Sequence, residues 1–66
     1  MDTFLTRLVE EKRELEVRTE KLQGFIEGSQ FQSIDPIQQS LLNAQIFSMK
    51  TYAQILTERI SWLSKH

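Results

Sequence analysis

The segment GSQFQSIDP, residues 28–36, decides the fold because it interrupts two long stretches of helix-forming residues. Gly28 is a helix stop signal, and Asp35 followed by Pro36 is a helix start signal. The sequence therefore predicts helices over residues 3–27 and 36–64, joined by a connection over residues 28–35. At about 1.5 Å per residue both helices are roughly 35–45 Å long, so a short connection makes them antiparallel neighbours. The predicted fold is all-α, an antiparallel two-helix hairpin that forms a single domain over residues 1–66.

Each predicted helix carries a line of side chains spaced alternately four and three residues apart, as on a helix face that packs against another helix. In the first helix the line is Leu8, Lys12, Leu15, Thr19, Leu22 and Ile26. In the second helix it is Leu42, Ile46, Met49, Ala53, Leu56, Ile60 and Leu63. These two lines are expected to face each other, and Phe31 and Ile34 are expected to close the connected end of the hairpin.

The second helix carries a further line, beside the first, in which apolar and polar residues are mixed. Its members are Leu41, Gln45, Ser48, Tyr52, Ile55, Arg59 and Trp62. A single partner helix cannot cover both lines. A chain of 66 residues without cysteine also buries too little surface to be comfortably stable alone. The sequence therefore predicts that the hairpin assembles with other copies of itself into a homo-oligomeric helical bundle.

Composition argues against several functions. With 8 Lys and Arg against 9 Asp and Glu, the net charge of −1 disfavours binding to DNA or RNA polymers. No apolar run approaches the ~18 residues that span a membrane, and the charged N-terminus does not resemble a signal peptide, so we expect a cytoplasmic protein without a membrane partner. His66 is the only histidine, and we find no cysteine, serine elbow or phosphate-binding glycine loop. No catalytic residue, metal site or cofactor is predicted, and the protein is expected to be a non-enzyme.

Lys12 is the one cation in the inward line of the first helix. Such a lysine can fix the register of two helices while its ammonium group reaches solvent, and periodicity alone favours this structural interpretation. Alternatively it binds an anionic ligand, because a buried ammonium group needs a negative partner. Arg7 and Arg59 also adjoin apolar residues, and Phe4 and Tyr52 offer rings on which a base can stack, although aromatic residues are more often core or interface.

The order of residues along most of the chain resembles a known family. The matching residues are Arg7-Leu8-Val9-Glu10-Glu11-Lys12-Arg13-Glu14-Leu15, Lys21-Leu22, Phe25-Ile26, Phe31, Leu41-Leu42, Gln45, Met49, Tyr52, Ile55-Leu56 and Glu58-Arg59-Ile60. They resemble the phage helical-hairpin domain shared by anti-CBASS cyclic-oligonucleotide sponges and anti-Thoeris sponges. The resemblance implies a hexamer in the host cytoplasm that holds cyclic di- or trinucleotides of bacterial immunity without cleaving them.

The resemblance also implies roles for particular residues. Lys12 matches the family lysine expected at a ligand phosphate, and this agreement favours the ligand interpretation over the structural one. Arg7 and Arg59 match recurrent arginines that contact either the ligand or a neighbouring subunit. Longer members carry an N-terminal segment with an aromatic residue that stacks on a base. The resemblance therefore implies either that Phe4 takes the place of that residue, or that the dinucleotide site is weakened or lost while a threefold trinucleotide site persists. The predicted ligand-binding residues are Lys12, Arg7, Arg59, Tyr52 and Phe4. The alternative is a structural or adaptor hairpin that binds a phage or host protein and no nucleotide.

Overall fold

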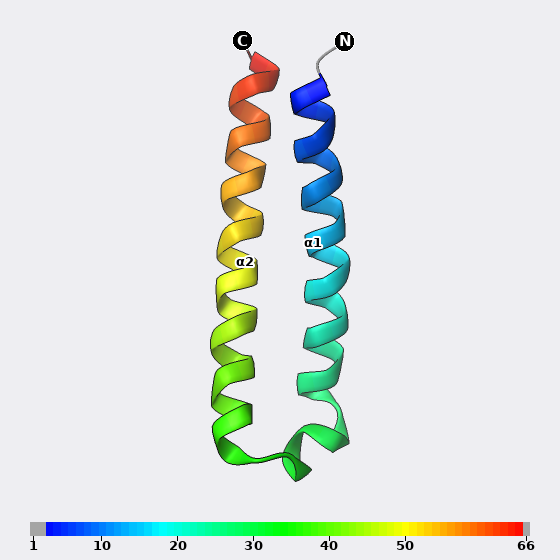
Figure 1. Ribbon diagram of the computed structural model, residues 1–66, viewed down its shortest axis with the longest axis vertical. Coiled ribbons are helices and arrows are strands. Elements are labelled where there is room, and N and C mark those ends of the chain that lie inside the picture. The colour runs from blue at the N-terminus through cyan, green and yellow to red at the C-terminus, as the bar shows by residue number, and fades with distance from the viewer. Residues whose placement is uncertain (1–2, 66) are drawn as a thin grey trace.

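The computed structural model describes residues 3–65. Helix α1 (Thr3–Glu27) is followed by the short 3-10 helix η1 (Ser29–Ser33) and by helix α2 (Pro36–Lys65). The two long helices lie side by side and antiparallel, so the two ends of the chain meet at one end of the molecule (Figure 1). The result is a rod with extents of 48 × 15 × 13 Å. The predicted all-α two-helix hairpin is confirmed.

The connection between the helices follows the local sequence signals, with one difference. The backbone N–H of Ile37 donates to Oδ1 of Asp35 at 2.8 Å, so Asp35 caps α2 as expected, and Pro36 is its first residue. Gly28 does end α1, but in an extended conformation (φ −83°, ψ 170°) rather than the left-handed one that helix-terminating glycines often adopt. A Cβ atom there would lie 3.3 Å from the carbonyl oxygen of Gly24, a close approach that favours glycine.

The two inward lines of side chains pack against each other as the sequence predicts. Leu8 and Leu15 of α1 and Leu56 of α2 form a buried cluster, with Leu56 completely buried. Ile46 is also buried, and the remaining members of both lines are half-buried, including Lys12. These contacts run along the whole length of the hairpin and hold the two helices in register.

Phe31 closes the connected end of the hairpin. It is buried, and its ring meets that of Phe25 edge to face with the centroids 6.2 Å apart. Ile34, three residues further along the chain, is half-buried. The connected end of the hairpin is therefore closed as expected. The helix η1, which the sequence did not predict, is the local structure that turns Phe31 inward.

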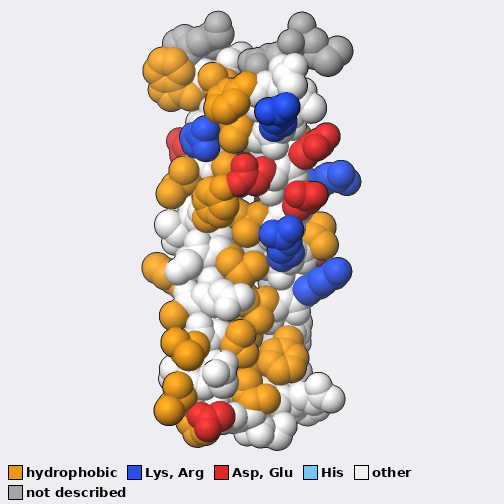
Figure 2. Space-filling view, in the orientation of Figure 1, with side chains coloured by type: hydrophobic (Ala, Val, Ile, Leu, Met, Phe, Trp, Pro, Cys, Tyr) orange, Lys and Arg blue, Asp and Glu red, His pale blue; other side chains and the backbone are white. Residues whose placement is uncertain are grey.

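Much apolar surface stays exposed on this single hairpin. Hydrophobic side chains follow α2, whereas most of the charged ones gather over the half of the molecule near the termini (Figure 2). The exposed large hydrophobic residues are Phe4, Val9, Val17, Phe25, Ile37, Leu41, Phe47, Tyr52, Ile55 and Trp62. The second line of α2 is exposed throughout, as expected for a surface that α1 does not cover. Neither long helix, over its described residues, has an apolar stretch of the length needed to cross a membrane.

Candidate functional site

The five predicted site residues are divided between the two long edges along which α1 meets α2. Glu11 and Lys12 are consecutive in α1, so their side chains project about 100° apart and flank the contact with α2 on opposite sides. Lys12 lies beside Thr57, Ile60 and Ser61 of α2 on one edge, which we call the Lys12 edge. Glu11 contacts Tyr52 on the other, which we call the Tyr52 edge.

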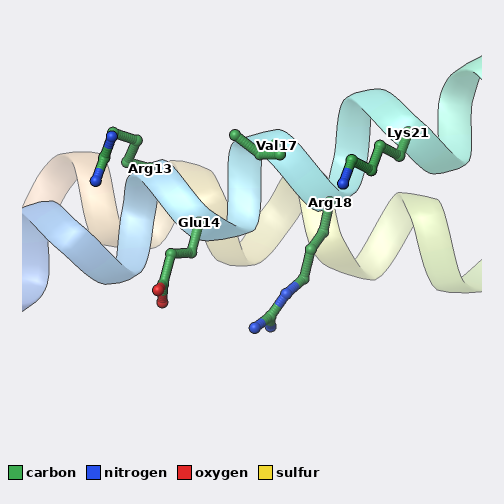
Figure 3. A pocket seen from close by; sticks show the side chains of 5 residues that line it. All are labelled: Arg13, Glu14, Val17, Arg18 and Lys21. Carbon is green, nitrogen blue, oxygen red and sulfur yellow. The ribbon is translucent and has the colours of Figure 1, made fainter.

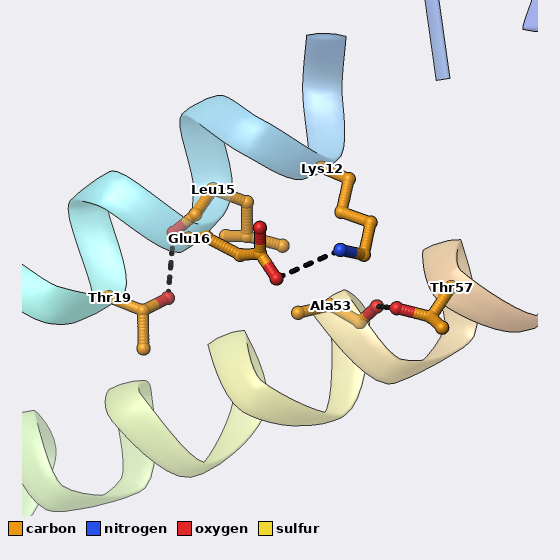
Figure 4. A network of polar contacts seen from close by, with 6 residues as sticks. All are labelled: Lys12, Leu15, Glu16, Thr19, Ala53 and Thr57. Carbon is orange, nitrogen blue, oxygen red and sulfur yellow. Dashed lines mark hydrogen bonds and ion pairs between the residues drawn. The ribbon is translucent and has the colours of Figure 1, made fainter. Parts of the chain in front are cut away.

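On the Lys12 edge, the ammonium group of Lys12 is met by a carboxylate of its own helix. Nζ of Lys12 lies 2.9 Å from Oε2 of Glu16, one turn further along α1 (Figure 4). The Lys12 side chain is 27% exposed and that of Glu16 is 49% exposed. The aliphatic stem of Lys12 therefore packs between the helices while its charged end reaches solvent, which is how lysines are accommodated at helix interfaces.

Two shallow grooves follow one another along the Lys12 edge. The first, of about 340 Å³, is lined by Val9, Lys12, Thr57, Ile60 and Ser61. The second, of about 250 Å³, is lined by Glu16, Thr19, Lys50, Ala53, Gln54 and Thr57. Because both include Thr57, they form one continuous open depression between the helices. Two lysines, one carboxylate and several hydroxyl groups line it together with apolar side chains.

The threonine hydroxyls of this depression are already oriented by the backbone. Oγ1 of Thr19 donates to the carbonyl of Leu15 at 2.7 Å, and Oγ1 of Thr57 donates to the carbonyl of Ala53 at 3.0 Å (Figure 4). Each hydroxyl oxygen keeps lone pairs that can accept a hydrogen bond. The threonines therefore suit contacts with N–H or O–H donors of a ligand, while Lys12 and Lys50 suit its negative groups.

The Tyr52 edge joins the helices through aromatic residues. The hydroxyl of Tyr52 donates a hydrogen bond to Oε2 of Glu11. Near the termini, the guanidinium group of Arg59 lies over the ring of Phe4, 5.7 Å from its centroid, in a cation–π contact. Arg7 is exposed on α1, one turn before Glu11. The residues Phe4 and Tyr52 are 53% and 41% exposed, so parts of both remain open to a ligand or another chain.

A third hollow lies on the outer surface of α1, away from α2. It measures about 330 Å³ and is lined by Arg13, Glu14, Val17, Arg18 and Lys21, which all come from one helix (Figure 3). These long side chains spread over the helix surface and are exposed. We interpret the hollow as the space between solvated side chains of a charged helix face.

Three charged residues at the two edges were not among the predicted site residues. Glu16 could have been found, because residues four apart on a helix are neighbours and a Glu–Lys pair at this spacing is common. Glu11 and Lys50 could not, since their positions follow from how α1 and α2 are packed. No group of residues that could hold a metal ion occurs in the part of the chain that the structure describes, and His66 lies outside it.

The fold and its two edges define a small helical-hairpin protein with shallow grooves along one side of the helix contact. The family model of Sequestin matches residues 2–62. An uncharacterised 7.5 kDa protein of Enterobacteria phage T4, from the denB–rIIB intergenic region, is 34% identical over 61 residues, covering 92% of this chain and 95% of the phage protein. No solved structure matches the chain significantly. The chain therefore belongs to the Sequestin family, and this membership indicates a protein that binds and sequesters rather than one that catalyses a reaction.

Proposed function

We propose that this protein sequesters cyclic di- or trinucleotide messengers of bacterial antiphage defence, without cleaving them, in the cytoplasm of a phage-infected host. The observation that carries the proposal is the half-buried Lys12 in a groove next to the groove that contains Lys50, in a member of a sequestering family. Cyclic oligonucleotides carry one negative phosphate per nucleotide, and charge-assisted hydrogen bonds from lysine are among the stronger polar contacts.

The division of the site residues between two edges supports binding by an assembly rather than by one hairpin. Lys12 on one edge and Tyr52 on the other face different sides of the same helix pair. A ligand whose phosphates contact Lys12 and whose bases stack on Tyr52 or Phe4 needs side chains from more than one copy of the chain. A homo-oligomer, which we propose to be the hexamer implied by the family resemblance, would bring such edges together.

Sequestration requires affinity but no chemistry. A messenger present at low concentration is removed from its receptor when binding sites are in excess and Kd is nanomolar, about −12 kcal/mol of binding free energy. Several phosphate contacts repeated by symmetry, together with stacking worth about 1–3 kcal/mol per base, are of the right size to supply it. The defence effector then stays inactive because its activator is bound elsewhere.

A second function remains consistent with the exposed apolar surface of α2, namely an adaptor hairpin that binds a phage or host protein. The two functions make different use of Lys12. In the adaptor the Lys12–Glu16 pair is a structural contact at the helix interface, whereas in the sponge Lys12 exchanges Glu16 for a phosphate.

A thermal-shift screen against cyclic di- and trinucleotides, with the corresponding linear dinucleotides as controls, tests the proposal. A ligand at 100 times its Kd stabilises the folded protein by about 2.7 kcal/mol, which is readily measured in a small protein. A sponge should be stabilised by at least one cyclic nucleotide and much less by its linear counterpart. The absence of any shift would favour the adaptor.

The fate of the bound ligand tests the second part of the proposal. After prolonged incubation and heat denaturation, chromatography should recover the cyclic nucleotide unchanged, because sequestration breaks no bond. Recovery of linear or mononucleotide products would show that the protein is an enzyme and would contradict the sponge mechanism.

A further inference from the structure

The second groove of the Lys12 edge forms where the smallest residues of the two inward lines meet. Thr19 is the smallest member of the line on α1, and Ala53 is the smallest member of the line on α2. Both are half-buried and line this groove, which we call the Lys50 groove. Its volume of about 250 Å³ is below the roughly 300–1,000 Å³ of pockets that enclose a whole small-molecule ligand. The groove therefore has room for one part of a ligand, such as the edge of a single ring.

The polar wall of the Lys50 groove follows from the spacing of residues on α2. Lys50, Gln54 and Thr57 are four and three residues apart, so they form one line along the helix, and this line borders α1. Among residues 3–65 no carboxylate pairs with Lys50, whereas Lys12 is paired with Glu16. The ammonium group of Lys50 therefore brings an uncompensated positive charge to the groove.

The two threonines of the Lys50 groove present hydrogen-bond acceptors only. Each hydroxyl group bonds to a carbonyl oxygen of its own helix, at 2.7 Å for Thr19 and 3.0 Å for Thr57, with Ala53 between them (Figure 4). A carbonyl oxygen has no hydrogen to donate, so the single proton of each hydroxyl must lie in this bond. The groove therefore offers one hydroxyl lone pair from each helix. Nε2 of Gln54 is turned to the carboxylate of Glu58, to which it donates at 3.0 Å, so Lys50 is the main donor of the groove.

We propose that the Lys50 groove binds the exocyclic amine of a nucleobase, the 6-amino group of adenine or the 4-amino group of cytosine. This inference rests on the proposed function and adds to it the choice of base. Such an amine has two N–H donors, which match one hydroxyl acceptor from Thr19 and one from Thr57. Hypoxanthine and uracil carry a carbonyl oxygen at the same position, which would face two acceptors. The protein therefore holds messengers that contain adenine or cytosine more tightly than those that contain hypoxanthine or uracil.

Lys50 suits the phosphate rather than the base. A hydrogen bond between an ammonium group and a phosphate joins two charged groups, and it is stronger than one to a neutral carbonyl oxygen. In a cyclic oligonucleotide every base is joined through its ribose to a phosphate, so a base in the groove brings a phosphate to the same edge of the hairpin. Lys50 therefore adds affinity for every messenger alike, while the two threonines distinguish the bases.

Calorimetric titration with matched nucleotides tests the choice of base. Cyclic di-AMP and cyclic tri-AMP are each compared with the ring of the same size that contains hypoxanthine, in which a carbonyl replaces each amine. For the ring size that binds, we expect Kd to be about 10-fold lower with adenine, as for other matched contacts to a base edge. A ratio below about 3, or a preference for hypoxanthine, would overturn the inference and leave the sponge mechanism standing.

Failure of both adenine rings to bind would also overturn the inference. The screen of all cyclic nucleotides then decides separately whether the proposed function fails as well. A protein that binds other cyclic nucleotides but neither adenine ring is a sponge with a different choice of base. A protein that binds none of them is not a sponge.

Threonine variants identify the residues that distinguish the bases. Thr19→Val and Thr57→Val keep the branched shape of the side chain but remove the acceptor. Each should raise Kd for the adenine ring about 3-fold or more and leave Kd for the hypoxanthine ring unchanged. A merely structural role would change both values together and leave their ratio as it is. Circular dichroism verifies that helicity is kept.

Thr51→Val is the matched control. The hydroxyl of Thr51 also donates to its own helix, to the carbonyl of Phe47 at 3.0 Å, but Thr51 lines neither groove of the Lys12 edge. The ratio of the two Kd values should therefore stay at its wild-type value. A wild-type ratio in the Thr19→Val/Thr57→Val double variant would show that the threonines do not choose the base.

Lys50→Met separates the phosphate contact from the base contact. We expect Kd to rise about 10-fold for the adenine ring and for the hypoxanthine ring, with their ratio unchanged. Lys21→Met removes a lysine from the outer surface of α1 and should leave both values unchanged. Unchanged affinity in Lys50→Met would remove Lys50 from the site. A ratio that falls to one would show that Lys50 contacts the base and would overturn the assignment of base choice to the threonines.

Discussion

Lys12 and Glu16 form an ion pair of 2.9 Å that joins the two grooves of the Lys12 edge, since each residue lines one of them. The pair has a direct consequence for ligand binding. A phosphate that approaches Lys12 must displace the carboxylate of Glu16 or bind beside it, and two negative groups near one ammonium group repel each other. Glu16 is therefore a competitor of the proposed ligand within the protein itself.

The first prediction is that Glu16→Gln binds a cyclic nucleotide more tightly than the wild type. The amide is nearly the same size as the carboxylate and removes the competing charge, so we expect Kd to fall about 2- to 10-fold. The stability lost should be small, about 0.3–0.5 kcal/mol, because exposed ion pairs one helical turn apart contribute little. Isothermal titration calorimetry measures the affinity.

Glu20→Gln is the matched control for this prediction. Glu20 is also an exposed glutamate of α1, but it lines neither groove of the Lys12 edge. Its amide variant changes the net charge by the same amount and should leave Kd nearly unchanged. If Glu16→Gln weakens binding instead, Glu16 contacts the ligand directly, for example through an N–H group of a base, and is not a competitor.

The second prediction concerns Leu56, the completely buried residue of the core. Leu56→Ala should reduce the free energy of unfolding by about 2–5 kcal/mol, the usual cost of removing a buried leucine side chain. Val17→Ala, on the exposed outer surface of α1, should change it by less than about 0.5 kcal/mol. Urea denaturation at one fixed protein concentration compares the variants, since assembly makes apparent stability depend on concentration. Equal effects at the two positions would mean that the core is placed elsewhere.

The third prediction separates the hydroxyl of Tyr52 from its ring. Tyr52→Phe removes the hydrogen bond to Glu11 and should destabilise the hairpin by about 0.5–1.5 kcal/mol, while the ring that can stack on a base is kept. Affinity for a cyclic nucleotide should stay within about 3-fold of the wild type. Tyr52→Ala removes the ring as well and should lose about 1–3 kcal/mol of binding free energy. Tyr52→Ala and Tyr52→Phe proteins with the same Kd would exclude Tyr52 as a stacking residue.

Most of the fold could be predicted because its signals are local. The spacing of Leu8, Leu15 and Leu56 identifies the inward faces, and Asp35–Pro36 marks the start of α2 where the structure has it. The conformation of Gly28 and the helix η1 were not predicted, because they depend on how Phe31 packs beneath the ends of the helices.

The site was less predictable than the fold. The sequence indicated Lys12 from its periodicity, yet it did not show that Lys12 and Tyr52 lie on opposite edges. That separation depends on which side of α2 each residue of α1 meets, a property of the tertiary contact rather than of either helix. Residues that the sequence suggests as parts of one binding site can therefore lie on different surfaces of the folded protein.

The last prediction is that Lys12→Ala loses affinity for the cyclic nucleotide while the protein keeps its helicity and mass. Because Lys12 is half-buried and one substitution changes every copy in an assembly, we expect Kd to rise about 10- to 100-fold, or roughly 1.4–2.8 kcal/mol. Stability should change little or rise, since removing a partly buried charge also removes its desolvation penalty. Lys12→Ala combined with Glu16→Gln completes a double-mutant cycle. If Lys12 binds phosphate, the gain in affinity from Glu16→Gln should shrink when Lys12 is absent, because the two side chains no longer compete. Unchanged affinity in a correctly assembled Lys12→Ala protein would remove Lys12 from the site and leave it the structural role of fixing the register of α1 and α2.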